Sequence, residues 1–334
     1  MHLPPMRLFC PPLLRAVALA MLGVLAGGAG CNDAPSRVDT PTGEASGRPL
    51  GGEGFTGTLR LGTTPELAAI VRRQADDFRK LYPQTTITVT ELSARAAIVG
   101  VLRGELESAI VDRSMNAEET GLAEEYSLAV GQTLIGEGAV VAVVPEASTV
   151  RAIPVTALQS LLAGRSVPWA GLSAGTAGEA RLVLTDRNAG TVEYVARRLL
   201  PAGALPQSAI RGANERDVLA RVAERPDAVG LVSALTLRAD TTARIRTVAL
   251  VDSVGRTVQP SPRAVYLDEY PLRQPIVLVT RGARGGIAAG FATFVLGTQG
   301  QETVQRAGLV PARPPVREFN LNSGDQTETA PSQP

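Results

Sequence analysis

The stretch TLRLGTTPELAAIVRRQADDFRKLYPQTTITVTE (58–91) decides the fold class. Its first five residues alternate apolar and polar side chains, which is the pattern of a half-buried strand. Thr64 and Pro65 then predict a helix start, with a hydroxyl cap followed by proline at the first helical position. Apolar residues recur at helical spacing over 65–81, and TITVTE (86–91) returns to alternation. The stretch therefore predicts strand, helix and strand in succession.

The same alternation of strands and helices continues along the chain. Further strands are predicted at 107–111, 139–145, 181–186, 228–233, 246–251 and 275–280. Further helices are predicted at 94–104, 156–164, 191–200, 215–223, 284–296 and 300–307. Strands that alternate with helices indicate an α/β fold with largely parallel sheets. In such sheets, ligands bind at the carboxyl ends of the strands, beside the helix N-termini.

The composition excludes several kinds of chemistry. The only histidine of the 334 residues is His2, and the only cysteines are Cys10 and Cys31. If the N-terminal segment is removed or tethered, the folded body has no imidazole or thiol, so it lacks Ser-His-Asp and Cys-His nucleophiles and zinc sites. The formal net charge of +1 gives no field that would recruit nucleic acid. We expect no enzyme, no metal and no organic cofactor.

Residues 1–31 have the pattern of an export signal. Arg7 and Arg15 precede an apolar run at 16–27. This run is shorter than the ~20 residues that a membrane-spanning helix needs. The run ends in Gly-Ala-Gly-Cys, which resembles the lipobox of bacterial lipoproteins and makes Cys31 the lipid-attachment residue. Gly28 departs from that pattern, because an aliphatic residue is usual there. The alternative is an ordinary cleavable signal peptide.

Two polar segments flank the predicted folded body. Residues 32–56 are rich in Pro, Gly, Ser and Thr, and they predict a flexible tether. Residues 316–334 are polar and predict a disordered tail.

Three loops that follow predicted strands have side chains suited to an anion. The first carries Thr63 and Thr64, with hydroxyls and helix N–H groups. The second, 186–191, carries Arg187, Gly190 and Thr191, which supply a guanidinium, close backbone approach and a hydroxyl donor. The third, weaker region combines Ser93-Ala94-Arg95 with Asp112, Arg113 and Ser114, and each of these two groups follows a predicted strand. The alternatives are a helix cap at Thr64 and a surface ion pair between Asp186 and Arg187.

Read in order, these and other motifs resemble the phosphate-binding proteins of ABC-type phosphate importers. The matching segments are LGTTPELA (61–68), KLYPQTTITV (80–89), Asp112-Arg113-Ser114, VTALQSLLAGRSVPW (155–169), 187–191, AVGLVS (228–233), 270–273, and 291–301 with 308–311. The resemblance covers about 57–313. Ala189 departs from the family, which has serine there, and so removes one hydroxyl donor.

The resemblance implies a two-lobed periplasmic-binding-protein fold of type II. Each lobe would hold a central, mostly parallel sheet flanked by helices, and two strands would form the hinge. Lobe one would contain 57–137 plus 262–315, and lobe two 138–261. The loops carrying Thr63, Thr64, Asp112, Arg113, Ser114, Arg187, Gly190 and Thr191 would bind the ligand, with Asp112 as the acceptor for a phosphate proton.

The resemblance also implies a function. The chain would be a monomer in the periplasm or cell envelope, anchored by lipid, that captures inorganic phosphate or a similar oxyanion and delivers it to an ABC permease in the inner membrane. Two alternatives stay open: an envelope sensor or scavenger that takes no part in transport, and an exported phosphatase-like hydrolase.

Overall fold

The computed structural model describes residues 55–171, 178–201, 204, 208–282 and 285–313. The predicted signal segment, most of the tether and the tail lie outside these residues. The opening stretch forms β1 (Gly57–Thr63), α1 (Ala68–Leu81) and β2 (Thr85–Glu91). Strands β1 and β2 pair in parallel over their full length. The predicted α/β class is confirmed.

The predicted start of α1 is wrong by three residues. The N–H of Leu67 donates to the carbonyl of Thr64 at 3.1 Å, and the N–H of Ala68 donates to that of Pro65 at 3.3 Å. These i→i+3 bonds form tight turns before the helix. The residue before α1 is therefore Leu67, which offers no side-chain cap. Thr64 lies in the loop and does not cap α1.

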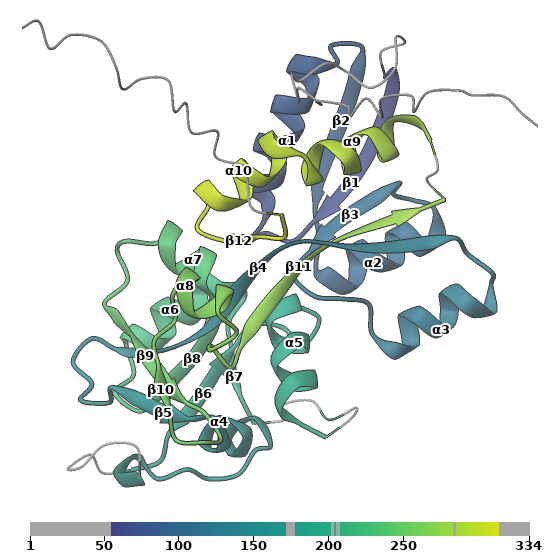
Figure 1. Ribbon diagram of the computed structural model, residues 1–334. Coiled ribbons are helices and arrows are strands. Elements are labelled where there is room, and N and C mark those ends of the chain that lie inside the picture. The colour runs from purple at the N-terminus through teal and green to yellow at the C-terminus, as the bar shows by residue number, and fades with distance from the viewer. Residues whose placement is uncertain (1–54, 172–177, 202–203, 205–207, 283–284, 314–334) are drawn as a thin grey trace, which may run out of the picture. The chain divides into compact units, whose positions relative to one another are not determined.

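The first sheet has the order β2-β1-β3-β11-β4 (Figure 1). Its further strands are β3 (Ser108–Val111), β11 (Arg273–Arg281), β4 (Val130–Pro145) and β12 (Val310–Pro311). Strands β2, β1 and β3 are parallel, and β11 is antiparallel to both of its neighbours, β3 and β4. The sheet is therefore mixed, because β11 runs in the opposite direction between strands that share one direction.

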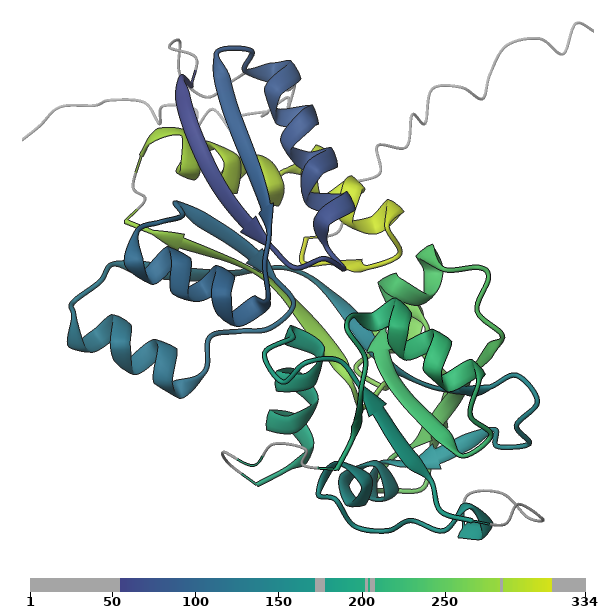
Figure 2. The same cartoon turned by 180° about the vertical axis from the view of Figure 1, so that it is seen from behind.

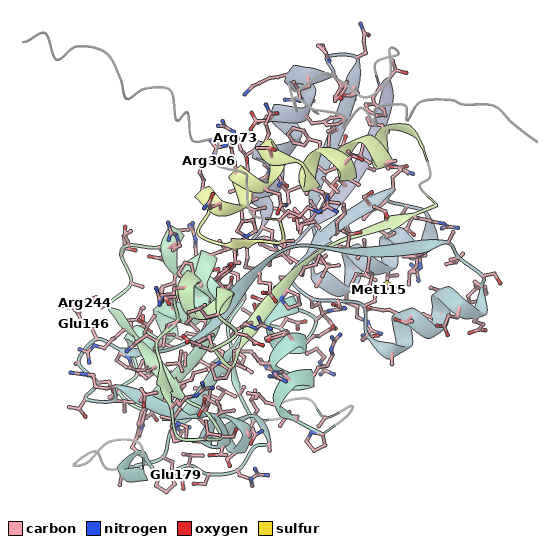
Figure 3. All side chains as sticks on the ribbon, viewed as in Figure 1. Arg73, Met115, Glu146, Glu179, Arg244 and Arg306 are labelled. Carbon is pink, nitrogen blue, oxygen red and sulfur yellow. The ribbon has the colours of Figure 1, made fainter. Side chains whose placement is uncertain are left out.

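Helices cover both faces of this sheet, as the two opposite views show (Figures 1 and 2). One core contains Leu61 of β1 with Phe78 of α1 and Phe291 of α9 (Gly286–Leu296), beside α10 (Thr298–Arg306). The other core joins α2 (Ala94–Arg103) to α3 (Ala117–Glu125). Met115, labelled in Figure 3, packs in this second core. The loops after β1 and β3 thus start from strands buried on both sides.

The second sheet has the order β4-β8-β6-β7, with β9, β5 and β10 joined to β4 through β9. Its strands are β5 (Ala152–Pro154), β6 (Arg181–Leu184), β7 (Ile210–Arg211), β8 (Ala228–Ser233), β9 (Ile245–Val251) and β10 (Thr257–Val258). Its helices are α4 (Val155–Leu162), α5 (Gly190–Leu199), α6 (Glu215–Ala223), α7 (Ala234–Ala239) and α8 (Pro262–Tyr266), with a short 3₁₀ turn at Trp169–Gly171. Strands β6, β7 and β8 are parallel, so β6 and β7 place the N-termini of α5 and α6 at one sheet edge.

Strand β4 belongs to both sheets. Its first part pairs with β11, and its last residues pair with β8 and β9. The change of partner lies near the predicted lobe boundary at 137. Ala264 and Leu272, which precede β11, pack in the core of the second sheet. The chain therefore passes from the core of the second sheet to the first sheet after residue 272 and not at 262. The division into lobes at 137 and 262 stays a prediction.

No helix within the described residues is long and apolar enough to cross a membrane.

Candidate functional site

Asp112 lies directly after β3, at the carboxyl end of the first sheet, and its side chain is 2% exposed. Its Oδ2 accepts a hydrogen bond from Nε2 of Gln274 in β11 at 2.9 Å. Its Oδ1 is buried and has no hydrogen-bond partner in the described part of the chain. Burial, and secondly the charge of Glu66, raise the pKa of Asp112 to about 7, although its own backbone N–H, the charge of Arg113 and the hydrogen bond from Gln274 lower it. Asp112 therefore presents an unsatisfied oxygen in a dry place.

The turn between β1 and α1 contributes two hydroxyls and one carboxyl. Thr63 and Thr64 are both buried, and Thr63 Oγ1 has no hydrogen-bond partner among the described residues. Glu66 follows in the same turn. Burial raises the pKa of Glu66, while its own backbone N–H and the hydroxyl of Thr64 lower it. The charge of Glu66 raises the pKa of both Asp112 and Glu215, so this carboxyl lies near both of them.

The N-terminus of α5 meets Asp112. Gly190 is buried, and a methyl group added to it would lie 1.7 Å from Asp112 Oδ1 and 2.3 Å from its Cγ. Only glycine allows the helix backbone to approach the carboxyl this closely. Ala189, which precedes the helix, offers no side-chain cap. The first N–H groups of α5 therefore lie beside the unpartnered carboxyl oxygen.

Thr191 and Glu215 form a buried pair next to this contact. Thr191 Oγ1 lies 2.6 Å from Glu215 Oε1. The other oxygen of Glu215, Oε2, accepts hydrogen bonds from the Ser233 N–H at 2.9 Å and from the Thr236 hydroxyl. Burial, and secondly the charge of Glu66, raise the pKa of Glu215 to about 8.

Arg113 follows Asp112 in the chain, and its guanidinium forms ion pairs with two carboxylates. It is 0% exposed, and its Nη1 and Nη2 each lie 2.8 Å from an oxygen of Glu119. Its Nε lies 2.5 Å from Glu193 Oε2 in α5. The half-buried Ser114 accepts hydrogen bonds through its carbonyl from Arg113 and Arg197, both at 3.0 Å. Arg113 and Ser114 thus belong to an ion cluster and not to the group around Asp112.

Arg187 lies in the turn before α5 and is exposed. Arg211, at the end of β7, donates to the Thr185 carbonyl at 2.8 Å. Burial lowers the pKa of Arg211, the charge of Asp186 raises it and the charge of Arg187 lowers it. The two guanidinium groups therefore lie near each other at the carboxyl edge of the second sheet. This edge also carries the start of α5.

The structure thus brings Asp112 together with Gly190, Thr191, Glu66 and Glu215. It places Thr63 and Thr64 in the turn that carries Glu66. Sequence reasoning missed Glu66, Glu215 and Arg211. The two glutamates stand within a helix-start pattern, where an acidic residue is ordinary, so no sequence signal distinguishes them. No group of three His, Cys, Asp or Glu side chains that could hold a metal occurs within the described residues.

Two mixed sheets thus share strand β4, and the loop after β3 meets the start of α5 through Asp112 and Gly190. The family model of the PBP superfamily domain matches residues 44–299, and the chain belongs to this family. No curated protein matches the chain in sequence.

Solved structures with the same fold include three described as phosphate proteins. A putative phosphate ABC transporter substrate-binding protein with bound phosphate from Clostridium perfringens has a TM-score of 0.65 at 16% identity, over 77% of this chain and 100% of that one. An ABC-type phosphate transport receptor from Vibrio cholerae has a TM-score of 0.62 at 15% identity, over 76% and 100%. A possible phosphate-binding protein from Planctomyces limnophilus has a TM-score of 0.53 at 17% identity, over 77% and 93%. At these identities, the likeness confirms the predicted fold.

Proposed function

We propose that this chain is an extracytoplasmic solute-binding protein that captures inorganic phosphate, or a similar protonated oxyanion, for an ABC importer. The observation that carries the proposal is the unpartnered Oδ1 of Asp112 against the N-terminus of α5. Near neutral pH, phosphate still carries a proton, so a carboxyl with a pKa of about 7 can share that proton with it. Sulfate has no proton to share, and an ionised Asp112 would repel it.

The surrounding groups supply the rest of an oxyanion site. The helix N–H groups of α5 and the hydroxyl of Thr63 are donors for phosphate oxygens. Arg187 and Arg211 give positive charge at the same sheet edge. The fold shared with the phosphate-binding structures supports the same ligand class.

Thermal unfolding of the full chain with phosphate, and in parallel with sulfate, tests the proposal. A ligand present at about a thousand times its dissociation constant adds about 4 kcal/mol to the free energy of unfolding and raises the midpoint by several degrees. We expect a shift with phosphate alone. Equal shifts with both anions, or no shift with phosphate, would contradict the proposal.

Arg187→Ala tests where the charge for the anion comes from. Because Arg187 is exposed, we expect the free energy of unfolding to change by less than ~0.5 kcal/mol while the phosphate shift disappears. Arg216→Ala, on exposed α6 surface, is the matched control and should keep the shift. A variant that loses stability but keeps phosphate binding would show that Arg187 serves the surface pair with Asp186.

Export and anchoring belong to the same proposal. The sequence of 1–31 supports an exported protein with a lipid on Cys31, which would act as a monomer with a permease of the inner membrane. Metabolic labelling with a radioactive fatty acid should mark the wild type and not Cys31→Ser. Labelling of both would contradict the anchor.

We also propose that the chain catalyses no reaction. The body lacks histidine and cysteine, and the family is one of binding proteins. Incubation with a chromogenic phosphoester should give no turnover. Turnover that disappears in Arg187→Ala would instead support the hydrolase alternative. The sensor alternative predicts phosphate binding without loss of uptake when the gene is deleted.

A further inference from the structure

The Thr191–Glu215 pair has a consequence for the ligand, because a hydroxyl has only one proton to donate. If Thr191 donates that proton to Glu215, as an ionised Glu215 requires, the threonine presents only lone pairs to the space beside Gly190. A phosphate oxygen at that place would then meet an acceptor and be repelled. Thr191 can act as a donor to an oxyanion only if Glu215 does not take its proton.

The hydrogen bonds of Glu215 fix where a proton on that side chain would be. Its Oε2 already accepts from the Ser233 N–H and the Thr236 hydroxyl. The remaining oxygen, Oε1, has Thr191 Oγ1 as its neighbour at 2.6 Å. A protonated Glu215 would therefore carry its proton on Oε1 and donate it to Thr191. The threonine would then turn its own proton outward.

We propose that Glu215 is a positioning residue that donates a proton to Thr191 and so makes the Thr191 hydroxyl a donor to the bound oxyanion. This inference rests on the proposed function, because the oxyanion is the ligand of the same site. Phosphate thus binds the form of the protein in which Glu215 is protonated. When Glu215 ionises, the direction of the hydrogen bond reverses and the site loses a donor and gains a negative charge.

The environment of Glu215 supports a proton there at neutral pH. The side chain is 2% exposed, and no cation is among the groups that shift its pKa. The titratable groups of the same cluster are Glu66, from the turn before α1, which raises the pKa of Glu215, and Asp112, which lies against Gly190. From α5, β8 and α7, Glu215 faces Thr191, Ser233 and Thr236, which do not titrate in this range. Burial and Glu66 bring the pKa of Glu215 to about 8.

The test is the affinity of the full chain for phosphate as a function of pH, measured by titration calorimetry. From about pH 8 to about pH 9.5 inorganic phosphate is mostly the dianion, since its second ionisation lies about one pH unit below this range, so a change in affinity reports mainly on the protein. We expect the affinity of the wild type to fall steeply there, by up to about tenfold per pH unit. Asp112 titrates mainly below this range, with a pKa of about 7.

Glu215→Gln is the decisive variant. Its amide Nε2 can donate to Thr191 while its Oε1 accepts from Ser233 and Thr236, so it imitates the protonated glutamate permanently. We expect this variant to bind phosphate at pH 7 within a few fold of the wild type, with an affinity that no longer falls above pH 8. Glu224→Gln, an exposed change on the same helix region, is the matched control and should keep the wild-type pH profile.

Thr191→Val keeps the shape of the side chain and removes the hydroxyl. We expect it to bind phosphate about ten- to a hundredfold more weakly at pH 7, with a flatter profile above pH 8. The ligand-free unfolding midpoint of each variant shows that it is folded.

The outcomes separate this inference from the proposed function. If the wild type binds phosphate with an affinity that does not fall above pH 8, or if Glu215→Gln falls with the wild type, Glu215 has no such role and the phosphate function stands. If the wild type binds no phosphate at any pH, the proposed function fails, and this inference fails with it. A steep wild-type profile that is flattened in Glu215→Gln and Thr191→Val and kept in Glu224→Gln supports both.

Discussion

Asp112 and Arg113 are neighbours in the chain, yet their side chains enter two very different buried regions. Arg113 belongs to an ion cluster with Glu119 and Glu193, in which one guanidinium holds two carboxylates. Asp112 belongs to an acid cluster with Glu66 and Glu215, which contains carboxyls and hydroxyls but no paired cation. Successive residues at the end of a strand point to opposite sides, so one step along the chain separates the two.

The two clusters differ in whether their buried polar groups find partners within the protein. The ion cluster joins α3, the loop after β3 and α5, and its charges are paired within the chain. The acid cluster keeps an unpartnered Asp112 Oδ1 and carboxyls whose pKa values are raised to about 7 and about 8. A buried group without a partner is costly, so it indicates a place that something from outside completes. In the proposed function, the ion cluster holds α5 in place and the acid cluster binds the ligand.

The largest expected effect is on the ion cluster. Arg113→Ala leaves Glu119 and Glu193 buried without their cation, and removing one partner of a buried ion pair costs about 3–5 kcal/mol. We expect a loss of that size in the free energy of unfolding, measured with denaturant at pH 7. The matched control is Arg95→Ala, whose pair with Glu118 is exposed and is worth less than ~1 kcal/mol. Similar losses in both variants would show that the ion cluster does not hold the structure together.

A second change breaks the contact between α5 and the acid cluster. In Gly190→Ala, the added methyl group would lie 1.7 Å from Asp112 Oδ1, so the helix or the carboxyl must move. Overpacking of this kind costs about 1–3 kcal/mol, and we expect about 2.5 kcal/mol together with loss of the phosphate-induced shift in unfolding. Gly121→Ala in α3 has nothing within 4 Å of the new methyl and should be neutral or slightly stabilising. A stable Gly190→Ala variant that binds phosphate normally would remove α5 from the site.

Most of the fold was predictable from the sequence, because it depends on periodicity that is visible in one chain. The strands at 58–62, 86–91 and 228–233 lie within or match β1, β2 and β8. The helix at 94–104 matches α2, which ends at Gly104 in the left-handed conformation. Helix α3 was missed, because its apolar residues follow no helical period. The start of α1 was predicted wrongly, because a hydroxyl followed by proline also begins a turn.

The candidate site was predictable in part. A glycine at a helix start indicates close backbone approach, and this gave Gly190, but the sequence cannot tell what approaches it. Arg113 was predicted to bind the ligand, whereas in the structure its guanidinium is paired with glutamates of α3 and α5. Glu215 is far from Asp112 in the chain, and its distance from Thr191 depends on how β6 and β7 pair. Such contacts between distant segments carry no local signal.

The smallest of the three effects concerns the pH dependence of the acid cluster. Asp112 has a folded-state pKa of about 7, above the ordinary 3.8, so the folded state holds its proton more tightly than the unfolded state. The stability this gives is fully present below about pH 4 and is lost as the pH rises to about 7. Asp112→Asn has no proton to lose there. Relative to the wild type, we therefore expect Asp112→Asn to gain about 2 kcal/mol in the free energy of unfolding between about pH 5.5 and about pH 8, measured without ligand. Glu118→Gln, an exposed change, should leave the pH profile as it is. If Asp112→Asn instead becomes less stable than the wild type at pH 8, then Asp112 is ionised and paired within the chain, and the difference between the acid cluster and the ion cluster disappears.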